Sequence, residues 1–145
     1  MSARPVPETL MPWALSVLGE PGGRPELAAV AGDASSRRYF RFSSGGRSHV
    51  LVEAPPATEK NAEFLAIREL LDGQGVRVPG PLGADLERGF LLLEDLCDRL
   101  LLQALDEYSV DGYYRLAFDL LLGMTGSDMR VSGLGDYDRS LLEEE

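Results

Sequence analysis

The sequence is short of cysteine, lysine and histidine, and it has no long apolar run. Its 145 residues include one cysteine, Cys97, one lysine, Lys60, and one histidine, His49. A single cysteine excludes an intrachain disulfide and favours a reducing, cytoplasmic location. The near-absence of lysine leaves arginine as the main source of positive charge.

Two further deficits limit the partners of the protein. No apolar stretch approaches the ~20 residues that cross a bilayer, and the first thirteen residues hold three prolines and a glutamate instead of a secretory signal. Basic residues number 14 against 24 acidic ones, which gives a net charge of −10. Because such a surface repels phosphate backbones, we expect no nucleic acid as a partner. The lack of a long apolar run leads us to expect no membrane either.

Apolar periodicity predicts an α+β fold. Small, turn-forming segments separate period-2 stretches from helical ones, in the order of three strands, a helix, two strands and further helices. This order indicates an antiparallel sheet with one inserted helix, followed by a mostly helical region. The expected helices cover 8–18, 58–72 (with Thr58 as N-cap), 100–105 and 112–124; the strands cover 27–31, 37–42, 49–54, 76–82 and 89–93; a hairpin turn covers 43–46.

The sequence ends in RSLLEEE, which has the pattern of the first turns of a helix. A helix this short would have nothing to pack against. We therefore expect the 145 residues to be a fragment of a larger protein.

The stretch AGDASSRRYFRF, at 31–42, places small residues between two expected strands. Backbone N–H groups in such a loop can approach phosphate oxygens, as the glycine-rich loop of kinases does. Ser35 and Ser36 are small enough, and Arg37, Arg38 and Arg41 supply positive charge. The loop lacks repeated glycines, so a plain hairpin with exposed arginines is the alternative.

The returning strand, HVLVEAPP, holds Glu53 where protein kinases carry a phosphate-binding lysine. In one interpretation, Glu53 has no role in binding and faces solvent at the strand end. In the other, a basic residue elsewhere in the sequence replaces the missing lysine and binds the phosphates. Arg38 or Arg41 is then the expected phosphate partner, unless Lys60 reaches back from the following helix.

The inserted helix carries the acid that could orient this cation. In kinases a glutamate of this helix pairs with the lysine. Glu63 is the best placed, and it could pair with Arg38 or Arg41; Glu59 and Glu69 are expected to be solvated.

The segment FLLLEDL, at 90–96, is an apolar strand that turns acidic. A strand leaving a sheet exposes backbone groups that can pair with an adenine edge. Such recognition depends on no particular side chain, so the residue types alone do not establish it.

Together these segments resemble the aminoglycoside phosphotransferase superfamily, and within it the bacterial N-acetylmuramate/N-acetylglucosamine anomeric sugar kinases. DASSRRYFR, the acid before Ala-Pro-Pro, and GFLLLEDL carry the resemblance, which extends from about residue 13 to the end. It implies a protein-kinase-like fold, with a nucleotide-binding N-terminal lobe at 1–96 and a hinge exit and incomplete helical lobe at 97–145. The implied partners are ATP with Mg²⁺ and an amino sugar, in peptidoglycan recycling.

The same resemblance implies roles for individual residues. Ser35, Ser36 and Arg37 would belong to the phosphate loop, while Glu94 and Leu96 would offer a backbone carbonyl and a backbone N–H to adenine. Cys97 stands where the family often has glycine.

The sequence contains no His-x-Asp-x-x-x-x-Asn loop and no later aspartate motif for a metal, so we assign no catalytic or metal-binding residue. Asp136 and Asp138 come too early and are expected to be loop and cap residues. We expect the parent protein to be a kinase and these 145 residues alone to be inactive.

Three alternatives stay open. The first is a non-catalytic nucleotide-binding or interaction module. In the second, Arg37, Arg38 and Arg41 bind a different anion on the sheet. The third is a kinase acting on another hydroxyl or amino acceptor, such as an aminoglycoside.

Overall fold

A computed structural model of the protein describes residues 4–30 and 35–125. They divide into two compact units. The first unit holds the described residues up to Ala62 together with Val78–Leu100, and the second holds Glu63–Arg77 and the described residues from Leu101 onward. The predicted lobe boundary at residue 96 stays a prediction.

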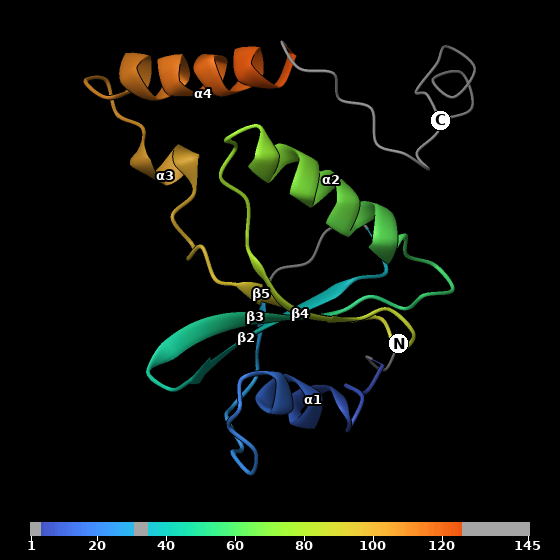
Figure 1. Cartoon of the computed structure of the whole chain (residues 1–145). Helices are drawn as coiled ribbons and strands as arrows, with labels where there is room; N and C mark the ends of the chain where they lie inside the picture. Colours follow the sequence, from blue (N-terminus) through green and yellow to red (C-terminus); the bar gives the residue numbers. More distant parts are fainter. Residues whose placement is uncertain (1–3, 31–34, 126–145) are drawn as a thin grey trace. The chain divides into compact units, whose positions relative to one another are not determined.

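The first unit is built on a five-stranded antiparallel sheet with strand order β1-β2-β3-β5-β4 (Figure 1). Helix α2 follows β3 in sequence and precedes β4, so the predicted α+β order with one inserted helix is confirmed. The strands are β1 (Ala28–Val30), β2 (Arg38–Ser44), β3 (Arg47–Glu53), β4 (Pro81–Asp85) and β5 (Phe90–Glu94); helix α1 is Leu10–Val17 and α2 is Asn61–Gly73.

The β2–β3 hairpin has a tighter turn than the sequence suggests. Ser44 pairs with Arg47, so only Gly45 and Gly46 form the turn, and both have positive φ (57° and 73°). Two positive φ angles in succession favour glycine, and they match the twist of a two-residue hairpin. The predicted turn at 43–46 was therefore two residues too long.

Helix α1 covers one face of the sheet (Figure 1). Strand side chains alternate between faces, so alternate residues of β2, β3 and β5 point toward this helix. Trp13 of α1 packs against Phe90 of β5, with ring centroids 5.8 Å apart. The buried core consists of Leu10, Ala14, Leu15, Phe40, Phe42, Leu51, Phe90 and Leu92.

The start of α2 differs from the prediction. Thr58 does not cap the helix; its backbone N–H bonds to the Pro55 carbonyl at 3.0 Å, in a turn that delays the helix until Asn61. The Asn61 side chain is buried and donates from Nδ2 to the carbonyl oxygen of Ala54 at 2.8 Å. This bond ties the first residue of the helix to the end of β3.

Position 89 has no room for a side chain and therefore favours glycine. Its φ is +70°, and an added Cβ would lie 2.0 Å from the carbonyl oxygen of Ala54. The same approach lets the Ala54 N–H donate to the Gly89 carbonyl at 2.7 Å.

The second unit contains the short helix α3 (Leu101–Ala104) and the longer α4 (Val110–Thr125), as predicted at 100–105 and 112–124. The expected loop and final helix start, including Asp136 and Asp138, lie outside the described residues. Within residues 4–30 and 35–125, no helix is long and apolar enough to cross a membrane.

Candidate functional site

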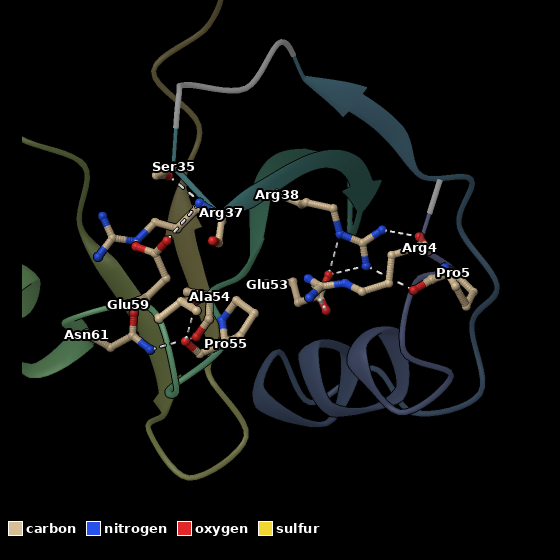
Figure 2. A network of polar contacts seen from close by, with 12 residues as sticks. Arg4, Pro5, Ser35, Arg37, Arg38, Glu53, Ala54, Pro55, Glu59 and Asn61 are labelled. Atoms are coloured by element: carbon tan, nitrogen blue, oxygen red, sulfur yellow. Dashed lines mark hydrogen bonds and ion pairs between the residues drawn. The ribbon is translucent and has the colours of Figure 1, made fainter. Parts of the chain in front are cut away.

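The end of the predicted phosphate loop is held by one carboxylate. The Ser36 backbone N–H donates to Glu59 Oε1 at 2.9 Å, and Arg37 Nε lies 3.2 Å from Glu59 Oε2. Figure 2 shows Arg37 turned toward Glu59, with the Ser35 hydroxyl accepting from the Arg37 backbone N–H. The Arg37 and Glu59 side chains are only 17% and 9% exposed, so this ion pair is largely shielded from water.

The expectation that Glu59 is solvated was therefore wrong. Glu59 precedes α2 instead of lying on it, so its side chain is not constrained to the helix face from which solvation was inferred. Glu63 lies in the first turn of α2, in the second unit, and its expected role as the orienting acid stays a prediction. Lys60 is exposed.

Arg38 pairs with Glu53, directly opposite on β3. Arg38 Nε donates to Glu53 Oε2 at 2.5 Å, and Arg4 Nη2 lies 2.8 Å from Glu53 Oε1. The guanidinium of Arg38 also donates to the carbonyl oxygens of Arg4 and Pro5, which anchors the N-terminal segment to the sheet (Figure 2). Glu53 is 6% exposed, so the alternative that it faces solvent is wrong.

Arg41 binds two carboxylates beyond the end of β5. Its Nε donates to Asp95 Oδ2 at 2.6 Å, and its Nη2 donates to Asp95 Oδ1 and to Asp98 Oδ1, each at 2.9 Å. The hydrogen bonds from Arg41 hold the pKa of Asp95 at about 2, well below its ordinary 3.8. Bonding to Asp98 and Asp95 in turn raises the pKa of Arg41.

The three arginines do not form one anion site. Arg38 shares a sheet face with Phe40, which packs against α1, whereas Arg41 lies on the opposite face, three residues further along β2. Arg37 precedes the strand and pairs with Glu59. The alternative of a single site built from Arg37, Arg38 and Arg41 is contradicted by these separate pairings.

The predicted adenine-binding segment begins at the last paired residue of β5. Glu94 is opposite His49, its N–H donates to the Gly80 carbonyl at 2.8 Å, and its Oε2 accepts from the Gly80 N–H at 3.2 Å. Leu96 lies beyond this pairing and is partly exposed. The strand thus ends where the sequence predicts, while adenine binding there stays a prediction.

The geometry of a kinase-like N-terminal lobe agrees with the comparisons to known proteins. The model of the phosphotransferase enzyme family matches residues 26–145. The chain belongs to this phosphotransferase family.

Among the relatives of this chain, a Pseudomonas aeruginosa N-acetylmuramate/N-acetylglucosamine kinase is 42% identical over 121 residues, which is 83% of this chain and 35% of the relative. A Pseudomonas putida protein of the same name is 42% identical over 82% of this chain, and a Neisseria meningitidis one 35% identical over 83%. The chain spans about a third of the length of these relatives. No solved structure matches it.

Sequence reasoning missed Asp95 and Asp98 as partners of Arg41, and Glu53 as the partner of Arg38. The Arg38–Glu53 pairing follows from the hairpin register, since correcting the turn to two glycines places these residues opposite each other. No local pattern signals the Arg41–Asp95 contact, which joins residues 54 positions apart.

The low pKa of Asp95 predicts a pH-dependent contribution to stability. A carboxyl whose pKa is lower in the folded state stabilises the fold above its ordinary pKa, and this contribution disappears as the pH falls toward 2. We expect the difference in unfolding free energy between the wild type and Asp95→Asn to stay constant above about pH 5 and to shrink below it. Urea unfolding across a pH series measures this difference; a difference that stays flat down to pH 2 would contradict the prediction.

Proposed function

We propose that the chain is the nucleotide-binding part of an ATP-dependent small-molecule kinase. In its complete form this kinase would phosphorylate the anomeric hydroxyl of N-acetylmuramate or N-acetylglucosamine in cell-wall recycling. The observation that carries the proposal is the 42% identity to N-acetylmuramate/N-acetylglucosamine kinases over most of this chain. A cytoplasmic location, suggested by the single cysteine, belongs to the same proposal.

The first unit offers donors suited to a nucleotide. The Ser36 N–H and the Arg37 guanidinium lie together where the loop enters β2, and both contact the Glu59 carboxylate. Groups of this kind bind phosphate oxygens, so a bound phosphate would compete with Glu59 for them. At the end of β5, Leu96 lies beyond the last strand pairing and is 45% exposed, which supports a role for its backbone in binding an adenine edge. We propose Ser35, Ser36 and Arg37 for the phosphates and the backbone of Glu94 and Leu96 for the base.

Mg²⁺ is expected with ATP in such an enzyme. No group of three histidine, cysteine, aspartate or glutamate side chains gathers as cation ligands within the part of the chain that the structure describes. The proposal therefore gives Mg²⁺ no ligand from these residues.

The decisive experiment uses the complete gene product. We expect it to bind ATP and to convert N-acetylmuramate and N-acetylglucosamine to their 1-phosphates, which phosphorus NMR distinguishes from phosphates at other positions. The 145 residues alone are expected to give no transfer, because their sequence contains no catalytic aspartate loop.

Other outcomes separate the alternatives. Transfer to an aminoglycoside but not to either amino sugar would replace the acceptor and keep the kinase. ATP binding by the complete gene product without transfer to any acceptor would favour a non-catalytic nucleotide-binding module. If the complete gene product does not bind ATP, the proposal is wrong.

A further inference from the structure

Asp95 joins three separate parts of the first unit. Its carboxylate accepts bonds from Arg41 of β2 at 2.6 and 2.9 Å, from the Ser48 hydroxyl of β3 at 2.6 Å, and from the Cys97 backbone N–H at 2.9 Å. The Asp95 side chain is only 4% exposed, so water competes little for these four bonds. We call Arg41, Ser48 and Asp95 the hinge clamp.

The hinge clamp lies at the segment that follows β5, where strand pairing has ended. Pairing between β3 and β5 ends with His49 opposite Glu94, and residues 95–98 continue without a partner strand. Cys97 adopts a φ of +70°, the one positive φ among the described residues other than glycine. This conformation is strained for a residue with a Cβ, and the bond from the Cys97 N–H to the Asp95 carboxylate holds it.

The clamp therefore fixes the residue between its two anchor points. Leu96 lies between Asp95, whose side chain is bonded to β2 and β3, and Cys97, whose N–H is bonded to Asp95. An adenine edge is bound more tightly when the direction of the backbone groups is set before the base arrives, because ordering a loose segment weakens binding.

We propose that Arg41 and Asp95 are positioning residues that set the backbone at Leu96 for recognition of an adenine edge. Arg41, which the sequence suggests as a phosphate partner, is thereby assigned to the base end of the nucleotide. The inference rests on the proposed function, since it presumes that the nucleotide is an adenine nucleotide.

Three ligands separate this role from others when tested on the complete gene product: ATP, adenosine and inorganic tripolyphosphate. Asp95→Asn keeps the shape of the side chain and removes its charge. We expect it to weaken ATP and adenosine binding by the same factor, about ten-fold, and to leave tripolyphosphate binding unchanged. Isothermal titration calorimetry measures all three affinities.

Two further variants test whether the clamp works as a unit. Arg41→Gln is expected to match Asp95→Asn, and the double variant is expected to be no weaker than either alone, because both changes break the same contact. Ser48→Ala removes one of the four bonds and should cause a smaller loss of adenosine affinity, so the test holds even if Asp95→Asn folds poorly. The matched control is Asp85→Asn, which breaks an ion pair with Arg88 in the β4–β5 turn and should change none of the affinities.

The outcomes distinguish the two levels of the proposal. If the wild type binds ATP and tripolyphosphate, and the clamp variants are folded and bind adenosine like the wild type, the clamp role is wrong while the proposed function stands. If the variants lose ATP and tripolyphosphate equally, Arg41 serves the phosphates and the clamp role is again wrong. If the wild type binds no adenine nucleotide, the proposed function fails and the clamp role fails with it.

Discussion

Replacing Arg37 with alanine in the complete gene product is expected to weaken ATP binding by about 10- to 100-fold and to leave adenosine binding unchanged. A hydrogen bond from a charged donor contributes about 1.5–3 kcal/mol, and each 1.4 kcal/mol corresponds to about ten-fold in affinity. Arg37 is the cation held beside the predicted phosphate loop, since Glu59 fixes its guanidinium at 3.2 Å. Comparing ATP with adenosine isolates the phosphate contribution from any general loss of folding.

The Glu59 carboxylate is expected to add to this loss of ATP affinity. Without Arg37, the Glu59 carboxylate stays beside the Ser36 N–H as a largely buried negative charge that repels phosphate. The double variant Arg37→Ala with Glu59→Gln removes this repulsion, because the amide oxygen of glutamine can still accept from Ser36. We therefore expect the double variant to bind ATP more tightly than Arg37→Ala alone.

The control for Arg37 is Arg88→Ala, which removes an exposed arginine paired with Asp85 on the β4–β5 turn. Arg88 pairs with Asp85, which is not among the residues proposed for the nucleotide, so ATP affinity should change little. The stability of the fold should also change little, because exposed ion pairs contribute about 0–1 kcal/mol. Equal ATP affinities for Arg37→Ala and the wild type would remove Arg37 from the phosphate site.

Most of the fold could be predicted from the sequence because it depends on local patterns. Alternation of apolar side chains located the strands, and glycine and proline located the turns between them. Most errors came at element ends, where tertiary bonds decide. The largest concerned the strand predicted at 76–82, because β4 begins only at Pro81 and runs to Asp85. Thr58 has the residue type of an N-cap, but the buried bond from Asn61 to Ala54 determines where α2 begins.

The ion pairs were harder to predict, because each arginine has many possible partners. The sequence has 24 acidic residues, and the partners observed for Arg37 and Arg41 are more than 20 positions away. Pattern alone does not select one partner at such separations. One feature was nevertheless accessible: Arg38 and Arg41 are three residues apart on a predicted strand, and an odd spacing places two side chains on opposite faces.

The placement of Arg38 and Arg41 on opposite faces of the sheet changes the role expected of Arg38. It lies on the α1 face with Glu53, at the opposite side of the sheet from Arg41, and its guanidinium is bonded to Glu53 and to two backbone carbonyls. Glu53 belongs to strand β3, and the two carbonyl groups belong to the N-terminal segment, so Arg38 joins this segment to the sheet. We therefore propose a stabilising role for Arg38 in place of the phosphate contact that the sequence suggested.

The Arg38→Ala variant should accordingly lose stability while keeping its affinity for ATP. Glu53 is 6% exposed, and removing one partner of a buried carboxylate costs about 3–5 kcal/mol. Arg4 remains bonded to Glu53, so we expect a loss of about 2–4 kcal/mol in the free energy of unfolding. Urea unfolding of the 145-residue protein, followed by the fluorescence of its single tryptophan, Trp13, measures this loss.

Two variants establish the cause of that loss. Arg4→Ala removes the more exposed partner of Glu53, because the Arg4 side chain is 51% exposed. This change should reduce stability by less than about 1 kcal/mol. Combining Arg38→Ala with Glu53→Gln should restore part of the stability, because the residue left buried is then neutral. If Arg38→Ala leaves stability unchanged and instead weakens ATP binding in the complete gene product, Arg38 contacts the phosphates as the sequence suggested.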